Sequence, residues 1–347
     1  MTEPQTQANR RKRNLGRIDH PSRSEDRVRF PASFGRRFLV FVDTEEEFDW
    51  SQPRRRDATA TTAIASLPEF QALADAHGFR PCYLIDYPVA TDCEAAAILR
   101  GWAAAGTCDI GTQLHPWVNP PHEEEVTTQN SFCGNLPEAL EREKLRLLSH
   151  EIERATGVRP VVYRAGRYGV GASTAAILED AGYRMDVSVR PYFDYSPEGG
   201  PNFRRHDPRP WWVGPQGRVL EVPLGVTFTG PLRRFSRFLR GESPSAGRRS
   251  ALLSRSGLAT RIALTPEDMP LDDVRRAIDV MLADGLALLS FSFHSPSLVP
   301  GHTPYVRTSA DLSSFYGWWD GVLAHLNGSG VRPASIADVL EAADSAR

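Results

Sequence analysis

The chain has 347 residues, of which 41% are hydrophobic and 24% are charged, and its formal net charge at pH 7 is −2. These values are ordinary for a globular protein, so they exclude a fully disordered chain and a strongly basic nucleic-acid-binding protein. No stretch approaches 18 uncharged apolar residues, so a transmembrane helix is not expected. The four cysteines form no Cys-x-x-Cys pair, which argues against a zinc ribbon and a disulfide-dense scaffold.

The N-terminal segment differs in charge from the rest of the chain. Residues 1–37 contain ten Lys and Arg residues and four acidic residues. Because no apolar segment follows the basic run, it does not resemble a secretory signal, and a cytoplasmic location is expected. We predict that residues 1–37 form a disordered basic tail. Attraction of this tail to anionic lipid, with peripheral membrane contact, is the alternative.

Beyond the tail, short apolar strands alternate with helices. In chain order the pattern predicts strand 37–43, helix 60–77, strand 81–85, helix 92–105, a strand ending at 113–115, helix 137–156, strand 161–164, helix 172–181, strands 183–189 and 219–224, helix 271–284, strand 286–294, and helices 310–327 and 335–346. This alternation favours an α/β fold with parallel strands. We expect one barrel-like domain over residues 38–347.

Residues 231–261 interrupt the alternation. They contain eight arginines, interleaved with Leu232, Phe235, Phe238 and Leu239 at helical spacing. We interpret the segment as a basic insertion that contains an amphipathic helix. Its apolar side would pack on the barrel or, alternatively, lie on a membrane surface.

Two acidic residues follow the first predicted strand. In a parallel α/β barrel the catalytic groups lie at the carboxyl ends of the strands. Asp43 and Glu45 are two residues apart there, a spacing that directs both side chains the same way. One such carboxylate can bind a metal ion while the other accepts a proton. A solvated acidic turn over residues 43–47 is the alternative.

Two histidines also lie at predicted strand ends. His115 is preceded by Gln113 and followed by Asn119. A histidine with a carboxylate suits Zn, Mn, Co or Fe, and an amide oxygen is a weaker third ligand. His294 ends the most apolar strand, where burial would lower its pKa. For both histidines, a hydrogen-bonded side chain in the core is the alternative.

Arg164 lies in a predicted buried strand and opens the segment Arg-Ala-Gly-Arg-Tyr-Gly. A guanidinium group does not lose its charge in a protein, so a buried one requires a carboxylate partner. Asp43 and Asp186 are the candidates. Arg164 would then either position a catalytic carboxylate or form a purely structural ion pair.

Taken together, these segments resemble the polysaccharide deacetylase family, carbohydrate esterase family 4, over residues 38–345. The resemblance implies a distorted (β/α)7 barrel that removes N- or O-acetyl groups from sugars with a divalent metal. Zinc is the first expectation, with Mn, Co or Ni as alternatives. Residues 293–301 extend the match in the manner of deacetylases from bacterial exopolysaccharide gene clusters.

The resemblance also implies a role for each candidate residue. Asp43 would be the base, and Glu45 and His115 metal ligands. The family's usual second histidine is replaced here by Asn119 or Gln113. Arg164 would orient the base, Asp186 would be the acid of another family motif, and His294 would lie near the leaving group. The expected sugar contacts are Trp117, Arg167, Tyr168 and Trp211.

The expected function is therefore metal-dependent hydrolysis of acetyl groups on N-acetylated sugars of a polysaccharide, oligosaccharide or glycolipid. Three alternatives remain open. One is a weakly active relative that binds glycan without hydrolysing it, because a histidine ligand is missing. The second is a glycoside hydrolase that uses two carboxyl groups on a similar barrel. The third is hydrolysis of a non-sugar amide.

Overall fold

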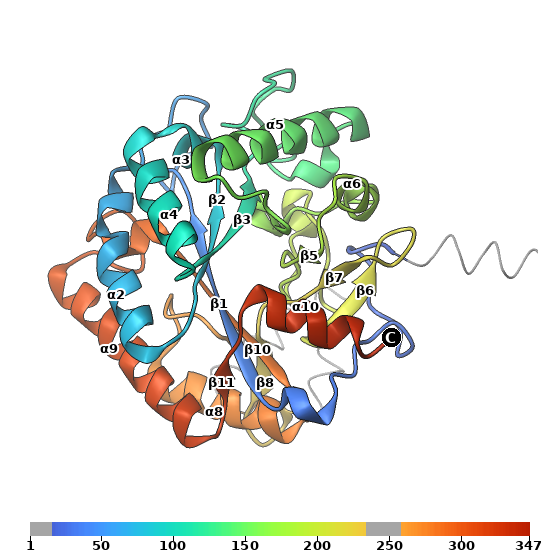
Figure 1. The fold of residues 1–347 in the computed structure, drawn as a ribbon, viewed down its shortest axis with the longest axis vertical. Coiled ribbons are helices and arrows are strands. Elements are labelled where there is room, and N and C mark those ends of the chain that lie inside the picture. The colour runs from blue at the N-terminus through green and yellow to red at the C-terminus, as the bar shows by residue number, and fades with distance from the viewer. Residues whose placement is uncertain (1–15, 234–257) are drawn as a thin grey trace, which may run out of the picture.

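The computed structural model describes residues 16–233 and 258–347. Its main sheet curls into a distorted barrel surrounded by helices (Figure 1). Seven of the described strands form a parallel array in the order β10-β1-β2-β3-β4-β5-β7, and β6 pairs antiparallel to β7. Their bounds are β1 Arg37–Thr44, β2 Cys82–Ile85, β3 Asp109–Leu114, β4 Val162–Ala165, β5 Met185–Asp186, β6 Trp211–Val213, β7 Val219–Glu221 and β10 Leu288–His294.

Helices surround this sheet, most of them on its outer face (Figure 1). They are α2 Leu67–His77, α3 Tyr87–Thr91, α4 Cys93–Ala105, α5 Glu138–Thr156, α6 Thr174–Asp180, α8 Leu271–Ala283, α9 Ser309–Gly328 and α10 Ile336–Asp344. The outward side chains of the strands pack on them, as where Phe293 of β10 meets Phe70 of α2 and Trp319 of α9 at ring-centroid distances of 4.6 and 5.8 Å.

The inward side chains of the same strands form a second apolar cluster. Leu39 and Phe41 of β1 pack there with Leu84 of β2. Ile336 and Val339 of α10 belong to this cluster, so α10 closes the end of the barrel at which the strands begin. The opposite end, where the strands finish, is thereby left for polar groups.

Backbone hydrogen bonds carry the chain across the gap between β7 and β10. Leu224 N donates to Val189 O at 2.9 Å, and Gly225 N donates to Ser290 O at 3.0 Å. Gly225 has no room for a side chain, because a Cβ would lie 2.5 Å from Leu264. Strands β8 (Val226–Thr229) and β9 (Thr260–Ala263) then form a separate antiparallel pair, and β11 (Arg332–Pro333) pairs with β1.

The predicted single-domain α/β barrel is confirmed, and the predicted helices agree with the observed ones within a few residues except at residues 60–66. There a short 3-10 turn, Thr62–Ser66, precedes α2. The strand predicted at 183–189 is shorter than expected, because only Met185–Asp186 makes a ladder. None of the helices in the described part of the chain is long and apolar enough to cross a membrane.

The prediction of a disordered tail over residues 1–37 is wrong for residues 16–36. Ile18 is fully buried in the outer core cluster. Val28 N donates to Pro210 O at 2.9 Å, and Trp212 N donates to Asp26 O at 3.0 Å, so this segment runs along β6. Its few apolar residues are enough to anchor it despite its charge. Residues 1–15, and positions 234–257 of the predicted basic insertion, lie outside the described residues.

Candidate active site

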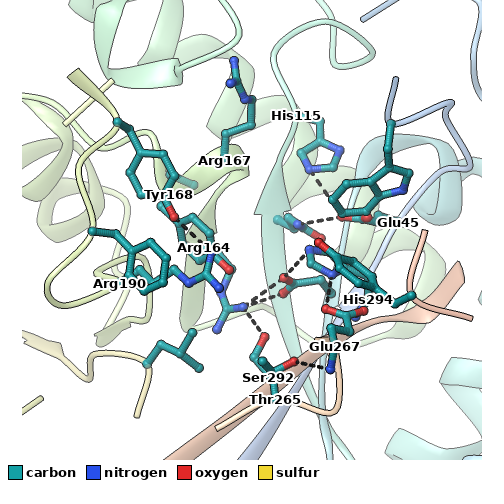
Figure 2. A pocket seen from close by; sticks show the side chains of 18 of the residues that line it. Glu45, His115, Arg164, Arg167, Tyr168, Arg190, Thr265, Glu267, Ser292 and His294 are labelled. Carbon is teal, nitrogen blue, oxygen red and sulfur yellow. Dashed lines mark hydrogen bonds and ion pairs between the residues drawn. The ribbon is translucent and has the colours of Figure 1, made fainter. Parts of the chain in front are cut away.

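A cavity of about 440 Å³ opens where the barrel strands end. Figure 2 shows charged and aromatic side chains converging on it from several strands. Nine residues predicted from the sequence line this cavity: Asp43, Glu45, Gln113, His115, Trp117, Arg164, Arg167, Tyr168 and His294. The alternation of side chains along a strand explains part of this set. Leu39 and Phe41 of β1 point into the barrel, and Asp43, two residues further on, points the same way.

Asp43 is held at the end of β1 by a buried arginine. Arg164 Nη1 donates to Asp43 Oδ1 at 2.8 Å and to Oδ2 at 2.9 Å. The same nitrogen donates to Ser292 Oγ at 2.6 Å. Asp43 and Arg164 are each 1% exposed, so the ion pair is shielded from water. Asp43 is therefore the carboxylate partner that the sequence required for Arg164.

His294 lies beside Asp43 and is oriented by Glu267. His294 Nδ1 is 2.7 Å from Glu267 Oε2, and the His294 backbone N–H donates to Glu267 Oε1 at 3.1 Å. Its Nε2 lies 3.6 Å from Asp43 Oδ2. Burial lowers the pKa of His294, but the carboxylates of Glu267, Glu45 and Asp43 outweigh it and raise the pKa to about 10. His294 is therefore a proton donor at neutral pH.

Substitution of Glu267 by Gln should lower the pKa of His294 by about 1–3 units, because the nearest anionic partner is lost. The His294 Cε1 proton shift, followed by NMR against pH, measures this directly. Ser297→Ala is the control, since Ser297 Oγ donates to Glu267 Oε1 at 2.7 Å and its removal leaves the carboxylate in place. An unchanged titration in Glu267→Gln would contradict the assigned pairing.

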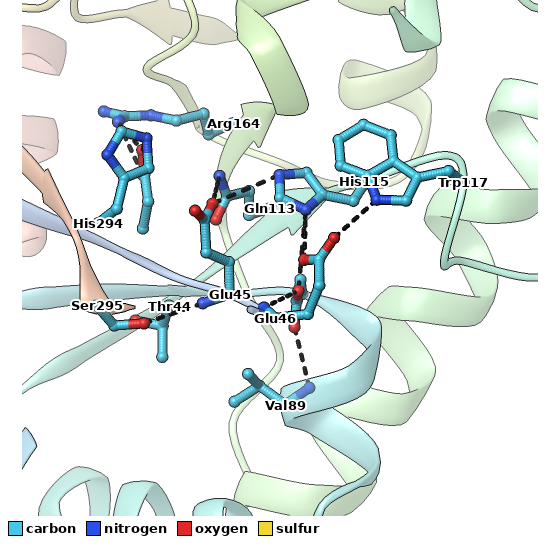
Figure 3. Close-up of polar contacts among 12 residues, drawn as sticks. Thr44, Glu45, Glu46, Val89, Gln113, His115, Trp117, Arg164, His294 and Ser295 are labelled. Carbon is cyan, nitrogen blue, oxygen red and sulfur yellow. Dashed lines mark hydrogen bonds and ion pairs between the residues drawn. The ribbon is translucent and has the colours of Figure 1, made fainter. Parts of the chain in front are cut away.

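A second group of polar atoms faces the cavity from β3 and the end of β1. Gln113 Nε2 donates to Glu45 Oε2 at 2.9 Å, and His115 Nε2 lies 3.6 Å from the same oxygen (Figure 3). Glu45 Oε1 and Gln113 Oε1 are buried without a hydrogen-bond partner. Burial raises the pKa of Glu45 to about 7, although His294 and His115 oppose the shift.

His115 is oriented from behind by a buried carboxyl pair. His115 Nδ1 is 2.7 Å from Glu46 Oε2, and Trp117 Nε1 donates to Glu46 Oε1 at 2.7 Å. Asp86 accepts from the backbone N–H groups of Glu46 and Val89 at 2.8 and 2.9 Å. Burial raises the pKa of Glu46 to about 8 and that of Asp86 well above its usual range, so the adjacent carboxyls do not both ionise at neutral pH.

Two sets of residues therefore offer ligand atoms for a metal. Glu46, Asp86 and His115 Nδ1 form a buried cluster whose ligand atoms lie within 4.8 Å of one another and could hold a metal ion. In that cluster each carboxyl oxygen is already engaged in a hydrogen bond. The cavity-facing set has two acceptors with no donor and an imidazole whose other nitrogen is held by a carboxyl group, the usual support for a metal-bound histidine. The cavity-facing set fits a cation better.

The loop after β3 is fixed to α5, and this explains the position of Asn119. Lys144 is fully buried, and its Nζ donates to the backbone oxygens of Pro116, Asn119 and Pro121. Asn119 Nδ2 donates in turn to Lys144 O at 3.0 Å. Asn119 does not line the cavity. Of the two amides considered as a third ligand, only Gln113 lies beside Glu45 and His115.

Asp186 and Trp211 also lie away from the cavity. Met185 and Val187 point into the barrel, so Asp186, which lies between them, points outward. Its Oδ1 accepts from Ser188 Oγ at 2.6 Å, and Ser188 Oγ accepts from the Ala165 N–H at 2.8 Å. Asp186 thus supports the end of β4 without touching the site. Trp211 packs in the outer core cluster, so its prediction as a sugar contact is wrong.

Arg167 and Tyr168 reach the cavity through an unusual backbone turn. Both residues have positive φ angles, 55° and 59°. Arg167 pairs with Glu198 and packs over the Phe132 ring at 4.1 Å, while the Tyr168 ring stacks on Tyr195 at a centroid distance of 5.7 Å. This turn presents an aromatic surface to the cavity.

Several cavity residues had no signal in the sequence. Glu267 lies in the loop after β9, 27 positions before His294, and only the fold brings the two together. Trp50 lies in the loop after β1, with its ring centroid 5.0 Å from that of His294 and 5.7 Å from that of Tyr305. Arg54, Arg190 and Arg261 also line the cavity.

Comparisons of the whole chain with known proteins find solved structures of the same fold. No protein-family model matches the sequence, and no curated protein matches it. A Mycobacterium smegmatis structure described as a candidate polysaccharide deacetylase superposes with a TM-score of 0.54 and 16% identity, covering 94% of this chain and 95% of that one. A structure from Pseudomonas aeruginosa PAO1 described as a probable polysaccharide deacetylase gives a TM-score of 0.50 and 15% identity, covering 90% and 92%. The chain therefore has the single-domain α/β barrel fold of these two structures.

Proposed function

We propose that the protein is a metal-dependent hydrolase that removes acetyl groups from N-acetylated sugars of a polysaccharide or oligosaccharide. One observation carries the proposal: Asp43, fixed by Arg164, lies 3.6 Å from His294 and lines the same cavity as Glu45 and His115. The fold shared with structures described as polysaccharide deacetylases supports it. The resemblance of residues 293–301 favours a role in exopolysaccharide or cell-envelope synthesis.

Glu45, His115 and the amide oxygen of Gln113 would hold the divalent ion. Such an ion polarises the acetyl carbonyl and lowers the pKa of a water molecule. A glycoside hydrolase would not require two buried oxygens, Glu45 Oε1 and Gln113 Oε1, that lack hydrogen-bond donors.

Asp43 accepts the proton of the attacking water. Arg164 Nη1 contacts both of its carboxylate oxygens, so the carboxylate is fixed in direction before substrate arrives. His294 then donates a proton from Nε2 to the leaving amine, because Glu267 fixes Nδ1 and leaves Nε2 free to face the cavity. Each of these proton transfers contributes roughly 10²–10⁴ in rate.

The aromatic walls of the cavity suit a sugar ring. The Trp50 ring packs edge-on against His294 and Tyr305, and Tyr168 and Tyr195 stack along another wall. Sugar rings present C–H faces that pack on such surfaces, while a few polar groups fix their orientation. The leaving amine would then be held next to His294.

The expected result is release of acetate from N-acetylated chitooligosaccharides by protein loaded with Zn, Mn, Co or Ni, and loss of that release after chelation. Acetate is measured enzymatically, with reducing ends and oligosaccharide binding measured in parallel. Binding without acetate would identify a glycan-binding protein. New reducing ends without acetate would identify a glycoside hydrolase, and release from simple amides alone would identify a non-sugar amidase.

A further inference from the structure

Two arginines share one aromatic ring in the wall of the cavity. The Arg190 Cζ lies 3.9 Å from the centroid of the Phe193 ring, and the Arg261 Cζ lies 3.6 Å from it. Arg190 follows the end of the β5 segment and Arg261 lies in β9, so two separate parts of the chain bring these cations together. In Figure 2 Arg190 lies on the side of the cavity opposite His115 and Glu45.

Neither arginine has an acidic partner within the described residues. Arg190 Nη1 contacts the Tyr195 hydroxyl at 3.3 Å, and its Nε is buried without a hydrogen-bond partner. Arg261 Nη1 donates to the Tyr192 backbone oxygen at 2.8 Å. Burial, together with the nearby charge of Arg190, lowers the pKa of Arg261 to about 10. The two guanidinium groups therefore stay charged and repel each other.

Three other cations of the cavity are already paired with carboxylates. Arg164 pairs with Asp43, Arg167 pairs with Glu198, and Glu267 pairs with His294. Arg54 packs over the Phe48 ring, and its charge interacts with that of Glu45. Arg190 and Arg261 share the Phe193 ring, and neither forms an ion pair with a described residue. Each guanidinium group has a planar fork of N–H donors that can bind a carboxylate or a phosphate.

We propose that the substrate is an acetylated sugar that carries an oxyanion, a carboxylate or a phosphate, and that Arg190 and Arg261 bind this group. The inference rests on the proposed function, because it names the class of sugar for the same cavity. The anion neutralises two partly buried cations that no described acid compensates. Phe193 keeps both guanidinium groups in place before the ligand binds.

Binding measurements test the carboxylate and the phosphate separately. The wild-type protein is titrated calorimetrically with a hyaluronan tetrasaccharide and with neutral chitotetraose, and then with N-acetylglucosamine 1-phosphate and with N-acetylglucosamine. At least one anionic probe should bind ten or more times more tightly than its neutral counterpart. This preference should weaken as salt concentration rises. The probe that shows the preference identifies the oxyanion.

The variant Arg190→Gln/Arg261→Gln should lose at least tenfold affinity for that probe and keep its affinity for the neutral one, which also reports that it is folded. Arg146→Gln/Arg276→Gln is the control, because it removes the same charge from exposed positions on α5 and α8. Arg190→Lys should retain part of the preference.

Equal affinity for charged and neutral probes, or binding of neither charged probe, would overturn this inference. An equal loss of affinity for both probes in Arg190→Gln/Arg261→Gln would show that the arginines only support the wall. A failure of the proposed function has a different signature, namely a preference for the anionic probe without acetate release.

Discussion

Substitution of Asp43 by Asn should reduce the kcat for acetate release by roughly 10²–10⁴-fold, the usual contribution of a general base. Asn has a similar shape but accepts no proton, and its amide N–H2 would face the Arg164 donors in place of a carboxylate oxygen. The measurement is kcat at saturating oligosaccharide in metal-loaded protein. A kcat within about threefold of the wild-type value would contradict the assignment of Asp43.

The same substitution carries a stability cost that must be measured separately. Removing one partner of a buried ion pair typically lowers the free energy of unfolding by about 3–5 kcal/mol, and Arg164 is 1% exposed. Denaturant unfolding of Asp43→Asn therefore accompanies the kinetics, at a temperature where the variant is fully folded. Asp268→Asn is the matched control, because Asp268 is an exposed acid lining the same cavity, and its kcat should stay near the wild-type value.

The residues that could be predicted from sequence share one property. Asp43, Gln113 and Arg164 are inward-facing residues of strands that the apolar pattern of the sequence identifies. Once the strand is located, its carboxyl end is known. The alternation of side chains between the two faces of a strand then identifies the residues that point inward. Glu45 and His115 lie just beyond such ends. The α/β fold could likewise be predicted, from the alternation of strands and helices along the chain.

The same alternation explains the error at Asp186. A position near a strand end does not by itself determine which way a side chain points. Met185 and Val187 are apolar and lie in the barrel interior, so the intervening carboxyl points outward, toward Glu221 of β7. Burial raises the pKa of Glu221 well above its usual range, and raises that of Asp186 as well.

Loop residues escaped prediction for a different reason. Glu267 and Arg190 lie in loops outside the barrel strands, and Arg261 lies in β9, outside the main sheet. No periodicity connects a loop acid to a histidine 27 positions later. The order of the segment around Ile18 could not be predicted from its composition, in which charge dominates, because one buried apolar residue and backbone hydrogen bonds to the β6 region hold it.

Removal of Glu45 or His115 should abolish metal binding. Elemental analysis of purified protein should find about one divalent ion per chain, and Glu45→Ala and His115→Ala should contain none. Glu45 Oε1 has no hydrogen-bond partner, and His115 Nε2 lies 3.6 Å from Glu45 Oε2 while its Nδ1 is already held by Glu46. Asn119→Ala is the matched control, because Asn119 directs its amide to Lys144 O and should keep the full metal content.

The same measurement decides between the two ligand sets, since His115 belongs to both. Glu45 belongs only to the cavity-facing set, and Asp86 only to the buried cluster. A Glu45→Ala protein that retains its metal, beside an Asp86→Asn protein that loses it, would place the ion behind His115 and out of reach of a substrate. The reverse outcome places it in the cavity that Asp43 and His294 also line. Catalysis requires that second arrangement, because Glu46 and Asp86 do not line the cavity.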